Sequence, residues 1–191
     1  MKAKYYGEGQ DYIAHELIGE SGFYLDIGCA EPIKKNNTYA LELLGWHGIC
    51  IDKNNFTAQY QKYRPKTYYF CENVLRVDWS RLLQAYSDSY VIDFISMDVD
   101  DANIELMQSF PFDRFEFKVL CFETDEYNCG DKRKKVAEEV LAKYPQYYRL
   151  IDGVMIKGLK WEDCWVNEKY VDLKDRATQG IEYKDFKINE N

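Results

Sequence analysis

The feature of this 191-residue sequence that most constrains its fold is a regular alternation of short apolar runs and helical segments. Five runs typical of β-strands occupy residues 23–27, 47–51, 67–71, 91–97 and 117–122. Helical patterns occupy residues 36–44, 54–63, 79–86, 102–110 and 131–144. Because the later strands are almost continuously apolar, this alternation indicates a parallel sheet that helices cover on both faces.

The pattern changes after Pro145, where two strand-like runs follow each other directly. They occupy residues 147–156 and 161–166, and the linker 157–160 contains Gly158 and has no room for a helix. Such a pair predicts a hairpin, whose last strand runs antiparallel to its neighbour. The sequence therefore predicts an α/β fold with a doubly wound, mostly parallel, seven-stranded sheet and a C-terminal antiparallel hairpin.

The length favours a single domain with short additions at both ends. Residues 1–22 are expected to form an N-terminal segment around a helix at 10–18, and residues 23–167 the sheet domain. Residues 168–191 are charged and weakly patterned, and they are expected to form a C-terminal extension.

Charge and cysteine usage narrow the class of protein. With 25 Lys and Arg against 33 Asp and Glu, the net charge is −8, which repels a phosphate backbone and disfavours nucleic-acid binding. No apolar run reaches the roughly 18 residues of a membrane helix, and residues 1–10 have no apolar signal core. The six cysteines form no CxxC pair, which predicts reduced thiols and a cytoplasmic location.

Every predicted parallel strand is followed by an acid or an amide, at the sheet edge where such folds bind ligands. These residues are Asp26 with Gly28 for the first strand, Asp52 for the second, Glu72 and Asn73 for the third, Asp98, Asp100 and Asp101 for the fourth, and Glu123 for the fifth. Asp52 follows a glycine turn by about 20 residues, which is where a ribose diol is usually held. A polar side chain after the third strand, Glu72 or Asn73, could meet an adenine amino group.

Three stretches of the sequence resemble the FkbM-type S-adenosylmethionine-dependent methyltransferases. They are YLDIG at 24–28 with NNTY at 36–39, GWHGICID at 45–52, and DFISMDVD at 93–100. The second is similar to that family's GWxGxxIE, the third to its DFLSIDVDG, and NNTY to its SNTY. The resemblance extends from about residue 23 to 128 and implies a Rossmann-like class I methyltransferase fold.

The resemblance also implies roles for particular residues. Asp26 and Gly28 would shape the pocket for the methionine part of the cofactor, Asp52 would hold the ribose, and Asp98 would face the sulfonium and the acceptor. The residues expected around S-adenosylmethionine are Asp26, Gly28, Cys29, Asn37, Thr38, Asp52, Lys53, Asn73 and Val74.

Two roles remain open for the acids after the fourth and fifth strands. Asp98 is the candidate catalytic base for an acceptor hydroxyl. Alternatively, Asp98, Asp100 and Glu123 are oxygen ligands of Mg²⁺, which would lower the pKa of that hydroxyl. A structural role for Asp100 or Asp101 is to cap the helix that follows. The basic run at 132–135 is expected to be a solvated helix face.

The predicted function is O-methylation of a hydroxyl group on a small molecule or a glycan, without a nucleic-acid or membrane partner. A nicotinamide-dependent oxidoreductase is disfavoured because GxGxxG is absent. The other alternative is a non-catalytic Rossmann-like binding or scaffold protein. It is motivated by Ala30 and Pro32 in the first loop, where methyltransferases commonly have glycines, and by Asp101, where the family often has glycine.

Overall fold

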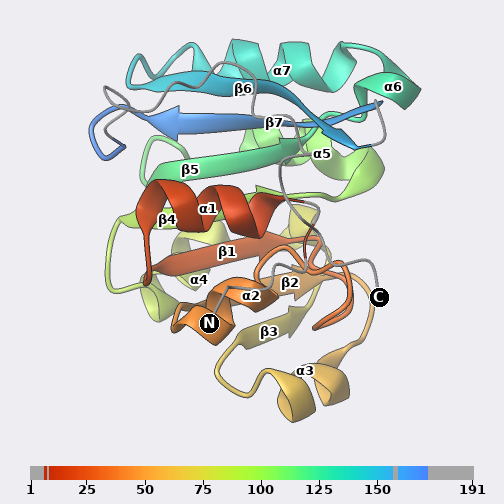
Figure 1. Ribbon diagram of the computed structural model, residues 1–191, viewed down its shortest axis with the longest axis vertical. Helices are drawn as coiled ribbons and strands as arrows, with labels where there is room; N and C mark the ends of the chain where they lie inside the picture. Colours follow the sequence, from red (N-terminus) through yellow and green to blue (C-terminus); the bar gives the residue numbers. More distant parts are fainter. Residues whose placement is uncertain (1–6, 8, 157–158, 172–191) are drawn as a thin grey trace.

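The computed structural model describes residues 7, 9–156 and 159–171 (Figure 1). Within them the strands are β1 (Phe23–Ile27), β2 (His47–Asp52), β3 (Tyr68–Cys71), β4 (Val91–Met97), β5 (Glu116–Glu123), β6 (Tyr147–Ile156) and β7 (Leu159–Asn167). The helices are α1 (Gln10–Ile18), α2 (Tyr39–Leu44), α3 (Thr57–Tyr63), α4 (Trp79–Tyr86), α5 (Asn103–Ser109), α6 (Glu126–Cys129) and α7 (Lys132–Leu141). Two 3₁₀ turns, η1 (Val74–Arg76) and η2 (Asp100–Ala102), follow β3 and β4.

The strands form one seven-stranded sheet in the order β3-β2-β1-β4-β5-β7-β6. Strands β1 to β5 pair in parallel, whereas β7 runs antiparallel to both β5 and β6. This confirms the predicted mostly parallel sheet with a C-terminal antiparallel hairpin. The chain order reverses between β1 and β4, so the carboxyl ends of these two strands meet at the switch point where ligands of such sheets bind.

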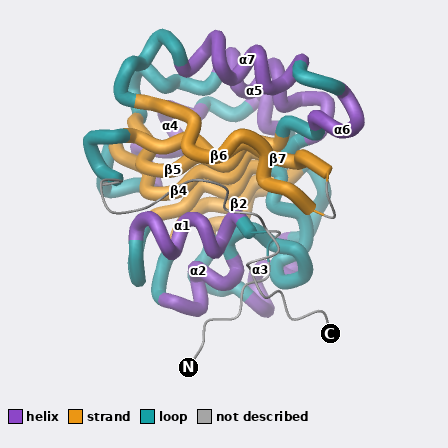
Figure 2. The backbone as a smooth tube through the Cα atoms, turned by 45° about the horizontal axis from the view of Figure 1, so that its top comes forward, coloured by secondary structure: helices purple, strands orange, loops and turns teal. Residues whose placement is uncertain are grey.

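Helices cover both faces of the sheet, with α1, α2 and α3 on one side and α4, α5 and α7 on the other (Figure 2). Each layer buries its own apolar core, which includes Leu41 and Tyr60 on the first side and Leu83 and Leu106 on the second. The central strand β4 is largely apolar, and five of its seven residues are buried, because helices cover both faces of the sheet. This double layer leaves the ends of the strands as the place for a ligand.

Where polar loop residues point into the protein, the helices begin later than the sequence pattern predicted. Helix α2 begins at Tyr39 instead of residue 36, because Asn36 donates to the Cys29 carbonyl (2.9 Å) and Thr38 donates to the Asp26 carboxylate (2.8 Å). Helix α5 begins at Asn103, after the turn η2. The short helix α6 ahead of α7 was not predicted.

At the two ends of the chain, the described residues pack against the sheet domain. Helix α1 lies where a helix was predicted, and its Ile13 and Ala14 are buried. Of the predicted C-terminal extension, residues 168–170 form a turn after β7 and Val171 is buried, and residues 172–191 lie outside the described residues. None of the described helices has the length and apolar character needed to cross a membrane.

Candidate functional site

A cavity of about 530 Å³ opens at the carboxyl ends of the strands beside the switch point. Its walls are the segments that follow β1, β2, β3 and β4. Seven of the residues expected at the site lie in these walls: Gly28, Asp52, Lys53, Asn73, Val74, Asp98 and Asp100. The other lining residues are Ala30, Asn54, Leu75, Val99, Asp101 and Ala102.

Gly28 allows the ends of β1 and β4 to meet at the cavity. Its φ is +88°, and a Cβ atom at this position would lie 1.6 Å from the carbonyl oxygen of Asp98. Backbone hydrogen bonds fix this contact, because Gly28 donates to the Ile51 carbonyl (2.8 Å) and Asp98 donates to the Ile27 carbonyl (2.9 Å). Only glycine satisfies both the positive φ and the close approach.

Asp52, at the end of β2, joins two walls of the cavity. Its Oδ2 accepts a hydrogen bond from the Ala30 amide (2.9 Å), and its Oδ1 accepts one from the Asn54 amide (2.8 Å). Each carboxylate oxygen has a second lone pair. The side chain can therefore hold the loop after β1 and still accept from a ligand hydroxyl.

The segment after β3 separates the two polar candidates of the third strand. Asn73 lies in the wall of the cavity, and its Oδ1 accepts from the Leu75 amide (3.0 Å), which leaves the side-chain NH₂ group for other partners. Glu72 instead lines a separate cavity of about 470 Å³ beside α4. Of the two residues, only Asn73 is placed to contact a ligand at the switch point.

Four residues expected around the cofactor lie beneath the cavity and are absent from its wall: Asp26, Cys29, Asn37 and Thr38. Asp26 is fully buried and accepts from Thr38 Oγ1 (2.8 Å), while Asn37 donates to Ser96 Oγ (2.9 Å). Burial raises the pKa of Asp26 to about 6, and its hydrogen bond from Thr38 opposes this rise. Thr38 and Asn37 thereby anchor the loop after β1 to the strands β1 and β4.

An acidic cluster lies at the other end of the cavity, after β4 and β5. Oxygen atoms of Asp98, Asp100 and Glu123 lie within 4.8 Å of one another. Burial raises the pKa of Asp98 to about 6. Burial, together with the charges of Asp98 and Asp125, raises the pKa of Glu123 to about 8. The Asp98–Glu123 pair therefore retains a proton to a higher pH than two isolated carboxyl groups would.

Arg133, from α7, lies behind this acidic cluster. Its Nη1 donates to Glu123 Oε2 (2.7 Å) and to Asp125 Oδ2 (3.1 Å), and Asn103 also donates to Glu123 Oε2 (2.7 Å). The prediction of a solvated basic face was wrong for this residue, which is 7% exposed. The signal was available, because Arg133 is four residues before the buried Ala137, on the apolar face of the helix.

The acids after β4 do not cap α5, so that structural role was also wrong. The residue before the helix is Ala102, and no side chain caps it. Asn103 Oδ1 instead accepts from the Val99 amide (3.0 Å), and Asp100 has a left-handed backbone with φ of 52°. Asp100 and Asp101 are exposed in the cavity wall, where they are available to a ligand.

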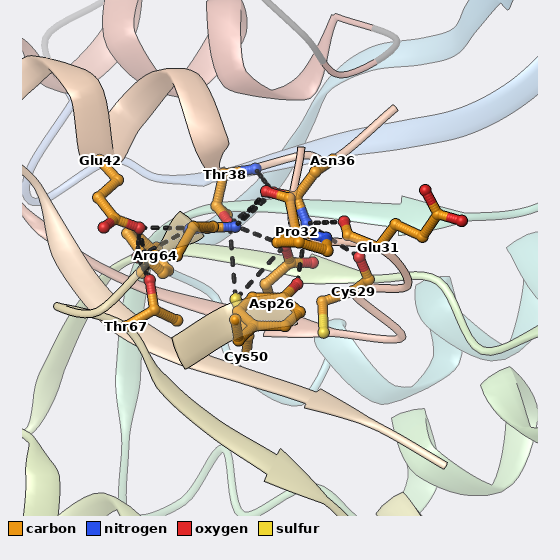
Figure 3. Close-up of polar contacts among 12 residues, drawn as sticks. Asp26, Cys29, Glu31, Pro32, Asn36, Thr38, Glu42, Cys50, Arg64 and Thr67 are labelled. Atoms are coloured by element: carbon orange, nitrogen blue, oxygen red, sulfur yellow. Dashed lines mark hydrogen bonds and ion pairs between the residues drawn. The ribbon is translucent and has the colours of Figure 1, made fainter. Parts of the chain in front are cut away.

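The residue that sequence reasoning missed entirely is Arg64. It follows α3, is completely buried, and lies among polar side chains from the loop between β1 and α2 (Figure 3). No local pattern marks it, because its acceptors lie 22 to 40 residues away in the sequence.

Several solved structures have a fold similar to that of this chain. The chain resembles an NADB-Rossmann superfamily protein from Streptococcus agalactiae, with a TM-score of 0.56, 11% identity, and coverage of 83% of this chain and 67% of that chain. It resembles an O-methyltransferase from Bacillus cereus solved with SAH, with a TM-score of 0.57, 13% identity, and coverage of 84% and 80%. A third similar structure is the 1,6-didemethyltoxoflavin-N1-methyltransferase of Burkholderia thailandensis, with a TM-score of 0.52, 12% identity, and coverage of 85% and 77%.

These likenesses, together with the strand order, establish a Rossmann-like fold of the class I methyltransferase type. No protein-family model and no curated protein sequence gives a significant match to this chain. The function of the chain therefore depends on the side chains at the switch point.

Proposed function

We propose that this protein is an S-adenosylmethionine-dependent methyltransferase, a member of the FkbM-type family, that methylates a hydroxyl group of a small molecule or a glycan. The observation that carries the proposal is the cavity at the switch point, because Asp52, Asn73 and Asp98 share its wall. Its volume of about 530 Å³ is within the range of small-molecule sites. The similar Bacillus cereus and Burkholderia thailandensis structures both contain S-adenosylhomocysteine, which supports the same cofactor here.

The residues around the cavity fit this cofactor. Asp52 has free lone pairs for the ribose hydroxyls, and Asn73 has a free amide group for the adenine edge. Lys53 and Val74 lie beside them, and Gly28 allows close approach of the methionine part. Asp26, Cys29, Asn37 and Thr38 would act indirectly, through the shape of the loop after β1.

When bound, the cofactor supplies a methyl group that its sulfonium already activates, so the protein has to align the acceptor and remove its proton. Asp98 is the proposed base, since this residue lies in the cavity wall and burial raises its pKa towards neutrality. A proton shared between Glu123 and Asp98 would hold the two carboxyl groups together and so orient Asp98. Arg133 and Asn103 hold Glu123 in place.

Asp98, Asp100 and Glu123 would be the ligands if the reaction uses Mg²⁺. Carboxylate oxygens suit this ion, and the three groups lie within 4.8 Å of one another. Because Glu123 Oε2 already accepts two hydrogen bonds, Oε1 is the atom left for the ion. A bound ion would lower the pKa of the acceptor hydroxyl.

A small, uncharged or positively charged acceptor suits the acidic end of the cavity better than a nucleic acid does, because Asp98, Asp100 and Asp101 all lie in its wall. We also propose a cytoplasmic location. All six cysteines are free, which supports a reducing compartment.

The test is calorimetric titration of the protein with S-adenosylhomocysteine, with and without Mg²⁺. We expect micromolar binding that Asp52→Ala and Asn73→Ala each weaken by about tenfold or more. Glu72→Ala is the matched control, because Glu72 adjoins Asn73 but faces the other cavity. Stronger binding with Mg²⁺ would support the metal site. Failure to bind either S-adenosylhomocysteine or S-adenosylmethionine would contradict the proposal and favour a non-catalytic binding or scaffold protein.

A further inference from the structure

Arg64 is a buried cation whose hydrogen bonds are directed largely at one loop. Its guanidinium is 0% exposed, and all five of its N–H groups have acceptors. The acceptors are Glu42 Oε2 (2.6 Å), Asn36 Oδ1 (2.7 Å), Tyr24 Oη (2.9 Å), Thr38 Oγ1 (3.1 Å) and the Pro32 carbonyl (3.5 Å). Three of these five groups belong to the loop between β1 and α2, as Figure 3 shows.

Asn36 connects the Arg64 guanidinium to the backbone of this loop by hydrogen bonds. Its Nδ2 donates to the carbonyl groups of Cys29 (2.9 Å) and Glu31 (3.0 Å). Its Oδ1, which accepts from Arg64, also accepts from the Thr38 amide (3.0 Å). One guanidinium and one amide thus connect both ends of the loop.

The loop needs such support because its backbone is strained. Ala30 and Lys35 have positive φ values of 50° and 53°, which residues with a Cβ atom rarely adopt. Strained conformations of this kind persist only where the surroundings fix them. In many nucleotide-binding folds, glycines remove the strain at this loop. Here the residues after Gly28 are not glycines, and the buried network supplies the constraint instead.

The position of the loop decides the shape of the cavity. Gly28 and Ala30 form part of its wall, and the Ala30 amide bonds Asp52. Arg64 itself is absent from that wall. Any effect of Arg64 on a ligand in the cavity must therefore pass through the loop.

We propose that Arg64 is a positioning residue for cofactor binding, which holds residues 28–38 in the binding-competent shape without contacting the cofactor. A preformed wall avoids the entropy loss of ordering the loop when the ligand binds. In this way the loop after β1 can form a cofactor site although it contains Ala30 and Pro32 where methyltransferases commonly have glycines. Its affinity component rests on the function proposed above.

The experiment compares Arg64→Lys and Asn36→Ala with the wild type by amide hydrogen exchange and by calorimetry with S-adenosylhomocysteine. Lysine keeps the charge but has three donors on one atom, so it cannot reach all the acceptors. We expect exchange of the amides in residues 28–38 to accelerate by about tenfold or more in both variants. We expect the affinity for S-adenosylhomocysteine to fall by about tenfold.

Arg149→Met is the matched control, because Arg149 pairs with the buried Asp163 far from the loop, among β6, β7 and α7. It should reduce stability while exchange in residues 28–38 and the affinity stay within about twofold of wild type. A purely structural Arg64 would behave like this control, with lower stability and unchanged loop exchange, and that result would overturn the proposal. If Arg64→Lys fails to fold, Asn36→Ala decides. If the wild type does not bind S-adenosylhomocysteine, the proposed function fails, while loop exchange still tests whether Arg64 holds the loop.

Discussion

Two buried arginines flank the cavity, and they differ in how completely their charge is matched. Arg64, below the loop after β1, has an acceptor for each of its five N–H groups and an ion pair with Glu42. Arg133 shares one nitrogen atom between Glu123 and Asp125, and Asp98 and Asp100 lie next to the same cluster. The first arginine completes a balanced network, and the second faces more carboxyl groups than it can neutralise.

This difference in charge matching suits the two arginines to different roles. A guanidinium with all its N–H groups hydrogen-bonded fixes a single arrangement of its acceptors, which suits a wall that must keep its shape. An excess of carboxyl groups leaves at least one of them protonated, as the raised pKa of Glu123 indicates. We infer that the cofactor end of the cavity is rigid and that the acceptor end holds exchangeable protons.

The largest effect on stability is expected at Gly28, where the carboxyl ends of β1 and β4 meet. In Gly28→Ala the new Cβ would lie 1.6 Å from the backbone oxygen of Asp98, so β1 and β4 must separate. We expect a loss of more than about 4 kcal/mol in unfolding free energy, measured by urea denaturation. Gly45→Ala is the control, because its φ is also positive but nothing lies within 4 Å. It should cost only about 1–2 kcal/mol, and equal costs for both variants would contradict the close approach.

Replacing each arginine by methionine compares the two networks directly. Arg64→Met leaves the Glu42 carboxylate without its buried partner, so we expect a loss of about 3–5 kcal/mol. Arg133→Met removes the cation shared by Glu123 and Asp125, whose carboxyl groups have raised pKa values and can take up a proton, so we expect a loss of about 1–3 kcal/mol. Urea denaturation at pH 7 measures both values. A larger loss of unfolding free energy for Arg133→Met than for Arg64→Met would contradict the proposed difference between the two ends of the cavity.

Asp26 supplies a pH test of the rigid end. Burial raises the pKa of its carboxyl from 3.8 to about 6, so the folded protein binds the proton more tightly than the unfolded chain does. Its contribution to stability therefore falls as the pH rises from about 4 to about 6, by roughly 3 kcal/mol in total. Asp26→Asn should lack this part of the decline, measured by urea denaturation across that range. The exposed Asp88→Asn should keep it, and the same decline in Asp26→Asn would exclude Asp26 as its source.

The smallest effect on binding is expected at Asp98, and it concerns the difference in affinity between two ligands. The Asp98 carboxylate should attract the positive sulfonium of S-adenosylmethionine but not the neutral sulfur of S-adenosylhomocysteine. In Asp98→Ala we expect the affinity for S-adenosylmethionine to fall by about threefold relative to S-adenosylhomocysteine, as measured by calorimetry. Methyl transfer should be lost as well, once an acceptor is known. An unchanged ratio of affinities with undiminished turnover would remove Asp98 from the mechanism.

The sequence was sufficient for the sheet, because the period of apolar residues depends on local burial. It also located the residues at the strand ends, since the carboxyl ends of parallel strands share one edge. It did not reveal which side chains turn inward. Asp26 and Thr38 were therefore expected around the ligand, but they are buried outside the cavity wall and hydrogen-bond each other. Arg64 could not be found at all, because its role depends on contacts between residues distant in the sequence.

The most direct test of the site is to map the amide chemical shifts of the isotope-labelled protein during titration with S-adenosylhomocysteine. We expect the largest changes at Gly28, Ala30, Asp52–Asn54, Asn73–Leu75 and Asp98–Ala102, which line the cavity at the switch point. Amides around the second cavity, such as those of Arg81 and Tyr86, should stay unchanged. Changes centred on the second cavity, or no changes at all, would contradict a cofactor site between the ends of β1 and β4.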